Sequence, residues 1–405
     1  MQTKLTANVE GKRKVLSFEN TEIAFKSKSN ADLKQAYWLF KLISSNFLVK
    51  VGSPITNFAL NIGLPIHGII KNTIFRQFCG GQTIADCDVA IQHLAAYNVH
   101  TILDYSVEGE ETETIFNTTC GEILKTVNHA QHDASIPFSV FKPTGLGRFR
   151  LFEKINAKQE LTIDETQEFE RIKMRIDKIC KACFEADIQV LIDAEHSWIQ
   201  DVIDDITREM MQKYNREKPI VFNTYQLYRH DKLSSLKADF YFAKTDGFYL
   251  GAKLVRGAYM EIERERAKEK GYPSPIQPNK EATDKNYNDA ILFCLDHLDR
   301  IAFMAGTHNE ESSRLLAVEI DKRNITHNFS GIYFAQLLGM SDNLSFNLAA
   351  TGYNVAKYMP YGPIAAVMPY LLRRAQENTS VAGQTSRELS LIIKEKKRRK
   401  FVCQH

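Results

Sequence analysis

Charged and polar side chains stand at the ends of most short apolar segments in this sequence. Asp104, Lys142 and Asp193 each close one such segment, and Lys253 closes another. Each of these residues alone is explained equally well as a solvated loop charge or as a bridge to a neighbouring helix. Together they favour one convergent polar site. Further polar residues in comparable positions are Tyr105, Gln226, Arg256, Thr307, His308, Asn309 and Tyr358.

A second polar group lies near the end of the chain. Tyr370, Arg373, Arg374 and Glu377 are spaced i, i+3, i+4 and i+7, so they share one stripe of a helix. A surface Arg373–Glu377 pair would explain part of the pattern, but such a pair contributes only ~0.3–0.5 kcal/mol. Separate apolar residues are available to bury this helix, and two adjacent arginines match the two oxygens of a carboxylate. The stripe therefore predicts a site for a small acid.

The elements that must position these groups alternate between short apolar runs and longer amphipathic runs. This alternation predicts parallel strands with helical crossovers. Strands are predicted at His100–Tyr105, Pro137–Lys142, Gln189–Asp193, Ile220–Thr224, Phe248–Leu254, Ile301–Gly306, Asn324–Ile332 and Val355–Tyr358. Helices are predicted at Thr162–Ala186, Trp198–Asn215, Asn286–Asp299, Glu310–Asp321 and Pro363–Asn378.

Eight such strands suit a closed (β/α)8 barrel, the TIM-type α/β fold, in which catalysis lies at the carboxyl ends of the strands. The alternative is an open sheet that binds a dinucleotide, but no G-x-G-x-x-G motif follows the first strand. The predicted domains are a helical N-terminal extension over 1–95, the barrel over 96–385 and a basic C-terminal tail over 386–405. Within the extension, Asp32–Val49 has the spacing of a helix.

Composition excludes several classes of protein. The chain has 405 residues, of which 44% are hydrophobic and 25% charged, so a full core is expected. A net charge of +3 is too small for a nucleic-acid binder. The seven cysteines form no disulfide framework, and Cys180 and Cys183 lack the further ligands of a zinc site, so they are predicted to be half-buried helix residues and no metal is expected.

No secretory or transit segment is recognisable at the start of the sequence, which predicts a cytoplasmic protein. Val51–Ile70 carries no charge, but its prolines, asparagines and glycines favour buried helices over a membrane span. The run Lys394–Lys400 (KEKKRRK) is expected to belong to a solvated, partly disordered terminus. A non-enzymatic alternative is that this run binds anionic lipid, at ~1 kcal/mol for each basic group.

Several short motifs occur in the order in which they occur in one known family. The sequence resembles the proline dehydrogenase family over about residues 75–385. The matching motifs are Lys253–Tyr259 (KLVRGAY), Tyr370–Asn378 (YLLRRAQEN), Leu103–Glu108 (LDYSVE), Lys142–Leu146 (KPTGL), Ile192–Glu195 (IDAE), Thr307–Asn309 (THN) and Gln336–Met340 (QLLGM).

This resemblance implies a monofunctional, FAD-dependent enzyme with a distorted (β/α)8 barrel. Such enzymes oxidise L-proline to Δ1-pyrroline-5-carboxylate, the first step of proline catabolism, by passing hydride from proline C5 to FAD N5 and then electrons to a membrane quinone. A noncovalent FAD at the strand ends would explain the missing Rossmann motif. An enzyme that reduces a membrane quinone would gain from peripheral contact with the inner membrane, and the basic tail could provide it.

The resemblance also implies roles for particular residues. Asp193 and Lys253 would be catalytic, with Lys253 near the flavin N5 and Asp193 beside Lys142. The residues expected to bind proline are Lys142, Leu337, Tyr358, Tyr370, Arg373 and Arg374. Those expected to contact FAD are Ala194, Gln226, Arg256, Gly257, Ala258, Tyr259, Thr307 and His308, with Glu377 bracing the arginine pair.

The sequence departs from the bacterial form of the family pattern at two places. Lys253 and Arg256 exchange the basic residue types of the commoner R-L-V-K motif, and Met260 stands where tryptophan is common. Two other activities are alternatives to proline oxidation. Hydroxyproline oxidation is disfavoured by Tyr358, whose phenol would crowd a ring hydroxyl. A Schiff-base barrel enzyme, in which Lys142 or Lys253 is the nucleophile, is the second.

Overall fold

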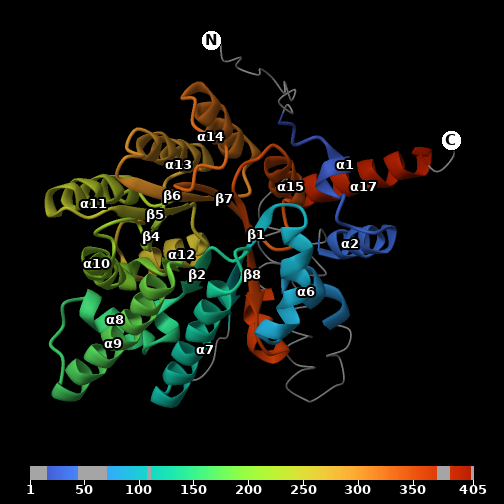
Figure 1. The fold of residues 1–405 in the computed structure, drawn as a ribbon. Helices are drawn as coiled ribbons and strands as arrows, with labels where there is room; N and C mark the ends of the chain where they lie inside the picture. The colour runs from blue at the N-terminus through green and yellow to red at the C-terminus, as the bar shows by residue number, and fades with distance from the viewer. Residues whose placement is uncertain (1–15, 44–70, 107–110, 372–383, 403–405) are drawn as a thin grey trace, which may run out of the picture.

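Eight parallel strands close into a barrel in the computed structural model, which describes residues 16–43, 71–106, 111–371 and 384–402. Each strand pairs with the next one along the chain, and β8 returns to pair with β1 (Figure 1). The predicted (β/α)8 fold is therefore confirmed. The strands are β1 (Val99–Tyr105), β2 (Phe138–Phe141), β3 (Gln189–Ile192), β4 (Val221–Gln226), β5 (Leu250–Val255), β6 (Ile301–Gly306), β7 (Ile332–Leu337) and β8 (Val355–Tyr361).

Helices cover the outside of the barrel (Figure 1). They are α6 (Ile84–Ala95), α7 (Glu113–Gln131), α8 (Phe149–Asn156), α9 (Ile163–Ala186), α10 (Ser197–Tyr214), α11 (Lys232–Asp246), α12 (Met260–Lys270), α13 (Lys280–Leu295), α14 (Glu310–Lys322) and α15 (Asp342–Ala350). Local sequence fixes several of their ends. In α9 the side chain of Thr162 accepts from the backbone of Glu165, whose carboxylate accepts in return from the Thr162 backbone, which is a capping box. Asp187 then ends α9 in the left-handed conformation.

Three buried clusters hold this arrangement together. Inside the barrel, Ile102, Phe138, Leu191 and Phe222 pack with residues of β6, β7 and β8. A larger cluster fills the layer between the strands and the surrounding helices. Strands buried on both faces read as continuous apolar runs, which is why seven of the eight predicted strands largely coincide with an observed one.

The predicted strand at Asn324–Ile332 is wrong, because β7 begins at Ile332 and runs to Leu337. The residues before it form turns. Asn324 takes a left-handed φ of 54°, and the backbone N–H of Ile325 bonds to the carbonyl of Ile320 at 3.0 Å, which ends α14. The β-branched residues of this segment therefore close a helix, while the true strand includes the polar Gln336 at its carboxyl end.

The N-terminal and C-terminal segments pack together beside the barrel. They are α1 (Thr21–Ala24), α2 (Asn30–Ile43), a π-helical turn at Lys71–Phe75, α5 (Arg76–Phe78) and α17 (Gln384–Val402). Phe40, Phe78, Leu391 and Ile392 share one buried cluster with residues of the helical segment 364–371. Figure 1 shows α17 alongside α1 and α2. The predicted helix Asp32–Val49 is confirmed up to Ile43.

The structure corrects the predictions for the C-terminal run and for the two neighbouring cysteines, and it does not describe the uncharged segment. The basic C-terminal run does not form a disordered terminus, since it lies in α17, where Glu395 is fully buried beside Arg398 and Arg399. Cys180 and Cys183 are completely buried, which raises the pKa of both thiols. Val51–Ile70 lies outside the described residues.

Candidate active site

Five charged or phenolic side chains, each from a different strand or from the residue that follows it, meet toward the carboxyl ends of the barrel strands. Lys142 directly follows β2, and its Nζ lies 3.1 Å from Asp193 Oδ2 and 3.6 Å from Asp104 Oδ2. Asp193 directly follows β3, and its Oδ1 is 2.5 Å from Lys253 Nζ. The hydroxyl of Tyr358, from β8, lies 2.5 Å from the same Lys253 Nζ. The predicted proximity of Asp193 to Lys142 is thus present, and Lys253 and Tyr358 extend the cluster.

The two lysines of this cluster differ in electrostatic state. Burial lowers the pKa of Lys253, and Asp193 only partly opposes that effect. At Lys142 burial also disfavours the charged form, but Asp104 and Asp193 outweigh it and hold the pKa above its ordinary value. The side chain of Lys142 is 35% exposed and that of Lys253 only 8%. Lys142 is therefore a fixed positive charge at the edge of the site.

Asp193 is a carboxylate at neutral pH. Burial favours its protonated form, but Lys253 and Lys142 lower its pKa below the ordinary value. The pKa of the Tyr358 phenol is raised, because the group is buried and faces Asp193 and Asp104. One carboxylate between two lysines, with a neutral phenol beside it, can orient an anionic substrate and hold a proton at a defined atom.

A cavity of about 310 Å³ opens beside Lys142. Tyr105, Phe149, Tyr259 and Tyr370 line it together with Lys142. Tyr370 comes from the helical segment 364–371, so the chain after β8 reaches the ends of β1 and β2. The cavity joins one ammonium to aromatic surface and has the volume of a small-molecule pocket.

The loop after β3 is held by residues whose role the sequence did not indicate. Both carboxylate oxygens of Glu195 accept from Thr144, at 3.0 Å from its backbone nitrogen and 2.6 Å from its hydroxyl. The backbone N–H of Glu195 donates to Gln200 at 2.7 Å, and its carbonyl accepts from Gln226 at 3.0 Å. Burial raises the pKa of the Glu195 carboxyl, and the hydrogen bonds from Thr144, which lower it, only partly offset that effect. These contacts fix the backbone that carries Asp193.

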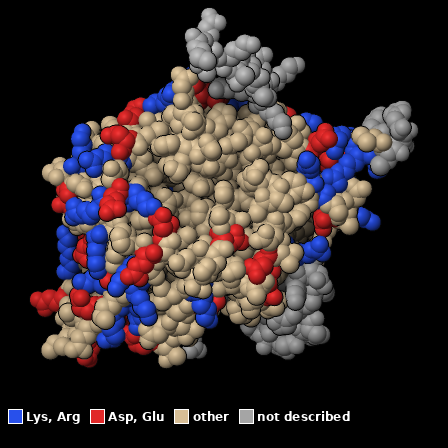
Figure 2. Space-filling view, viewed as in Figure 1, with Lys and Arg blue, Asp and Glu red and all other residues tan. Residues whose placement is uncertain are grey.

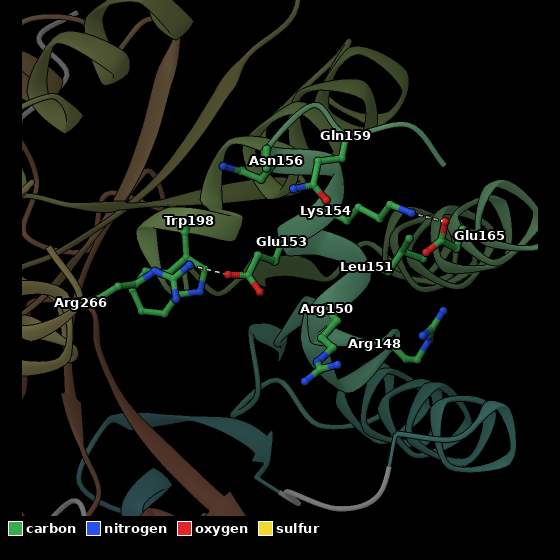
Figure 3. Close-up of a pocket in the computed structure, with 11 residues that line it drawn as sticks. Arg148, Arg150, Leu151, Glu153, Lys154, Asn156, Gln159, Glu165, Trp198 and Arg266 are labelled. Carbon is green, nitrogen blue, oxygen red and sulfur yellow. Dashed lines mark hydrogen bonds and ion pairs between the residues drawn. The ribbon is translucent and has the colours of Figure 1, made fainter. Parts of the chain in front are cut away.

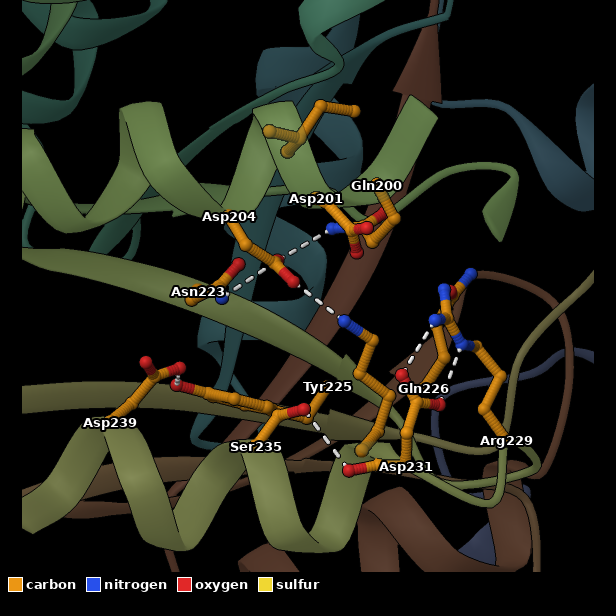
Figure 4. A network of polar contacts seen from close by, with 12 residues as sticks. Gln200, Asp201, Asp204, Asn223, Tyr225, Gln226, Arg229, Asp231, Ser235 and Asp239 are labelled. Carbon is orange, nitrogen blue, oxygen red and sulfur yellow. Dashed lines mark hydrogen bonds and ion pairs between the residues drawn. The ribbon is translucent and has the colours of Figure 1, made fainter. Parts of the chain in front are cut away.

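Gln200 belongs to a wider polar network behind the strands (Figure 4). Asp204 accepts from Gln200 at 2.8 Å, from Asn223 at 3.0 Å and from the buried Lys232 at 2.6 Å. Asp104 was recognised as a strand end and as part of a motif, and Glu195 only as part of a motif, with no role assigned to either. The signal for both was their position at the end of a strand beside residues already singled out.

The residues expected to contact a cofactor lie farther around the barrel mouth. Arg256 donates to Asp284 at 2.8 Å, to Thr307 at 2.6 Å and to Ser312 at 2.9 Å. His308 Nδ1 lies 2.9 Å from the hydroxyl of Ser341.

The other predicted positions in this region differ in burial. Gly257 and Ala258 are exposed, and Gly257 has a φ of 133°, which a larger residue would rarely adopt. Ala194 and Leu337 are half-buried, and Gln226 is buried. Arg373, Arg374 and Glu377 lie outside the described residues.

A larger cavity, of about 690 Å³, lies between α8, α9 and α10 (Figure 3). Its cations are mostly neutralised: Arg148 pairs with Glu168, Lys154 with Glu165, and Arg266 with Glu153. Arg266 also stacks over Trp198, 4.2 Å from the ring centre. This surface has the character of a set of structural ion pairs, so the smaller cavity at the strand ends is the candidate site.

A membrane-spanning element is not found in the part of the chain that the structure describes, where no helix is both long and apolar enough to cross a bilayer. Within those same residues no group of histidine, cysteine and acidic side chains is arranged to hold a metal ion.

Comparisons with known proteins bear on this site. A model of the family described as proline dehydrogenase matches residues 87–387. The chain is 33% identical over 428 residues to "Proline dehydrogenase 1, mitochondrial" of Dictyostelium discoideum, covering 94% of this chain and 75% of that protein. It is 30% identical over 427 residues to "Hydroxyproline dehydrogenase" of Xenopus laevis, covering 95% of this chain and 91% of that protein.

A solved structure of proline utilization A (PutA) from Bdellovibrio bacteriovorus matches with a TM-score of 0.69 and 19% identity. The match covers 91% of this chain but only 40% of PutA, so the chain spans less than half the length of that protein. At this identity the likeness supports the barrel fold.

Proposed function

The chain belongs to the proline dehydrogenase family of oxidoreductases, and from this premise we propose that it is an FAD-dependent enzyme that oxidises L-proline to Δ1-pyrroline-5-carboxylate. The observation that carries the proposal is the cluster of Lys142, Asp193, Lys253 and Tyr358 beside a cavity of about 310 Å³. These are the positions at which the family pattern places its reactive centre.

The residues present fit a flavin dinucleotide. The side-chain oxygen of Gln226 is buried and receives no hydrogen bond from any described residue, so it offers an acceptor for a ligand N–H. Lys253 and Arg256 place cationic groups on β5 and directly after it, which suits a cofactor that becomes more negative when reduced. Residues that would hold FAD are Ala194, Gln226, Arg256, Gly257, Ala258, Tyr259, Thr307 and His308, with Glu377 bracing the arginine pair.

Proline would be held mainly through its carboxylate. Lys142, together with Arg373 and Arg374, would supply the opposing positive charges. Tyr370 already lines the cavity beside Lys142, and Tyr358 and Leu337 would contact the ring. An arginine pair with a lysine matches a carboxylate in both geometry and charge.

When bound, FAD would supply the acceptor for the hydride that leaves proline C5 and the route by which the electrons reach a membrane quinone. The residues of this chain prepare the substrate for that step. The proline amine must first lose its extra proton, and the positive charge of Lys142 lowers the amine pKa. Asp193 holds Lys142 at 3.1 Å and Lys253 at 2.5 Å, so it fixes both cations.

Proline is favoured over hydroxyproline because of Tyr358. Its side chain is buried, and its hydroxyl is committed to Lys253 at 2.5 Å and to Asp193 at 3.3 Å. A phenol held in this way would crowd a hydroxyl on the substrate ring. The similarity to the Xenopus hydroxyproline dehydrogenase keeps that activity as the second candidate. A Schiff-base enzyme is third, supported only by the lowered pKa of Lys253.

An absorbance spectrum of the purified protein, taken before and after anaerobic addition of L-proline, tests the proposal. Flavin bands that bleach with L-proline are expected. Bands that bleach only with hydroxyproline would transfer the assignment to the second candidate. A colourless protein that takes up no FAD, and that borohydride couples covalently to a carbonyl substrate, would contradict the flavin mechanism.

A peripheral contact with a membrane surface accords with a quinone acceptor. Trp38 and Leu42, at i and i+4 on α2, are 51% and 54% exposed, and Lys41 Nζ lies 5.1 Å from the Trp38 ring centre. Lys397 and Lys400 are exposed on the adjacent α17, and Figure 2 shows basic side chains gathered over that helix. Exposed apolar residues flanked by lysines are typical of interfacial helices.

Sedimentation with phosphatidylcholine vesicles, with and without phosphatidylglycerol, tests this contact. Binding is expected only with the anionic lipid, and the double variant Trp38→Ser, Leu42→Ser should lose it. The matched control is Met174→Ser, an exposed apolar residue on α9. Equal binding by the double variant and the control would contradict a role for α2.

A further inference from the structure

Two neighbouring residues of α17 hold the two loops that follow β6 and β7. Arg387 Nε donates to Glu310 Oε1 at 2.7 Å, and Glu310 is two residues after His308. Glu388 accepts the backbone N–H of Ser341 at 2.5 Å, and Ser341 lies between β7 and α15. Both loops stand at the carboxyl ends of strands, so α17 contacts the face of the barrel that carries the candidate site.

Ser341 has an unusual backbone conformation for a serine. Its φ of 51° and ψ of 43° lie in the left-handed region, and the residue is completely buried. A non-glycine residue in this region costs on the order of 1 kcal/mol and persists only where its surroundings enforce it. The carboxylate of Glu388 is one such constraint, since it fixes the direction of the Ser341 N–H.

Lys357 supplies a second constraint on the same turn. Its Nζ, completely buried, donates to the carbonyl of Met340 at 2.5 Å and lies 3.0 Å from Asp342 Oδ1. The residues on either side of Ser341 are thus both held by one buried lysine. Lys28 also reaches Asp342, at 3.3 Å, so the N-terminal segment joins the cluster. The turn is built to present the Ser341 hydroxyl in one direction.

That hydroxyl contacts His308. The 2.9 Å separation between Ser341 Oγ and His308 Nδ1 fixes the orientation of the imidazole and therefore the direction of its other nitrogen. A ring held through one nitrogen has its other nitrogen in a defined position, as in many ligand-binding histidines. The chain of contacts runs from Glu388 through the Ser341 backbone and side chain to His308.

We propose that Glu388 is a positioning residue for the cofactor, which acts through Ser341 to orient the His308 ring toward the flavin dinucleotide. This inference rests on the proposed function, because it takes His308 as a cofactor contact. It adds that α17, after the barrel in the chain, contributes to cofactor binding without touching the cofactor. No covalent or redox step is involved.

Titration of the flavin-free protein with FAD, followed by quenching of flavin fluorescence, tests the proposal. Glu388→Ala and Ser341→Ala should each raise the Kd for FAD about tenfold, which corresponds to ~1.4 kcal/mol. Glu388→Gln should bind nearly as tightly as the unmodified protein, because its amide oxygen can still accept from Ser341. Lys397→Gln, an exposed charge on the same helix, is the control and should change nothing.

Combination with His308→Ala separates positioning from a general structural effect. If Glu388 acts through His308, Glu388→Ala should add little to the loss already caused by His308→Ala. Full additivity, or an unchanged Kd in Ser341→Ala, would overturn the proposal. Ser341→Ala keeps the backbone N–H and serves if Glu388→Ala fails to fold. An unmodified protein that binds no FAD would instead refute the proposed function.

Discussion

At the scale of single residues, Lys142 and Lys253 show how position changes one side-chain type. Both face Asp193, yet the pKa of Lys142 is raised and that of Lys253 is lowered. Lys142 has a second carboxylate, Asp104, and partial access to solvent, whereas Lys253 is enclosed. A charged lysine at the cavity suits substrate binding, and an enclosed one suits a role at the reacting atoms.

Replacement of Lys142 by alanine should weaken proline binding and slow flavin reduction. The variant lacks the positive charge that is proposed to face the substrate carboxylate. Without that charge the pKa of the bound amine rises, so its extra proton becomes harder to remove. A fall of about a hundredfold in kcat/KM is expected, equal to ~2.7 kcal/mol. Stopped-flow reduction under anaerobic conditions measures it, with Lys125→Ala, an exposed lysine, as control. Unchanged kinetics would remove Lys142 from the site.

Replacement of Tyr358 by serine should shift selectivity toward hydroxyproline. Removing the ring opens space for a substrate hydroxyl, and the ratio of kcat/KM values for the two substrates should change by about tenfold, or ~1.4 kcal/mol. Tyr358→Phe keeps the ring and removes only the hydroxyl bonded to Lys253, so it should retain the preference for proline. Identical ratios in both variants would show that Tyr358 does not select the ring.

The sequence predicted the residues of the polar cluster better than their contacts. Strand ends and family motifs indicated Lys142, Asp193, Lys253 and Tyr358, because the carboxyl ends of parallel strands meet at one face. The two hydrogen bonds from Thr144 to Glu195 could not be predicted, since they depend on how two separate loops pack. Periodicity defines which element a residue occupies, and it leaves side-chain pairing between loops undefined.

At the scale of elements, α17 departs most from expectation. Its run of lysines and arginines suggested a solvated end, but Leu391 and Ile392 are buried and Arg399 donates to the carbonyls of Phe25 and Lys28. The buried apolar residues of α17 lie just before the charged run, so the run considered alone gives no sign that it belongs to a packed helix. The wrong prediction of a strand at Asn324–Ile332 has a comparable cause, because β-branched residues in a turn resemble those of a strand.

The stability contributed by α17 should depend on pH through Glu388. Burial, and after it the nearby Asp342, raises the pKa of this carboxyl from 4.5 to about 7. The hydrogen bond from the Ser341 N–H and the charge of Lys357 lower the pKa but do not cancel that rise. A raised pKa means that the folded state binds the proton more tightly than the unfolded state. The contribution is therefore complete below about pH 4.5 and is lost as the pH rises through 7.

Glu388→Gln should remove this dependence, because the amide stays neutral at every pH. Relative to the unmodified protein, the variant should gain stability progressively between pH 4.5 and 7. Urea unfolding at a series of pH values measures the difference. A difference that stays constant across this range would mean that Glu388 titrates normally.

At the scale of the whole molecule, the barrel and the flanking helices form one structure. The core of the barrel was predictable from periodicity, whereas the packing of α2 on α17 joins segments more than 300 residues apart, which no local pattern reveals. The α1 segment also contacts α17, through ion pairs: Arg387 and Lys394 both pair with Glu19, and Arg398 pairs with Glu22.

Deletion of residues 392–405 should destabilise the folded protein. The truncated chain loses the buried Ile392, worth ~1.5–3 kcal/mol by itself, and the contacts of Glu395 with Thr21 and of Arg399 with the Phe25 carbonyl. A fall of several degrees in Tm is expected. Lys397→Gln with Lys400→Gln, which reduces charge and leaves the packing, is the control. An unchanged Tm in the truncated protein would show that this half of α17 packs only weakly.

The pairing of β1 with β8 and of α1 with α17 has a consequence for synthesis on the ribosome. β1 and α1 are made before their partners, and roughly 250 further residues separate β1 from β8, with more between α1 and α17. During that interval an unpaired strand edge and apolar helix faces are exposed, which are the features that chaperones recognise. The nascent chain should therefore complete its fold late, in one concerted closure, and should depend on holding factors until α17 has emerged.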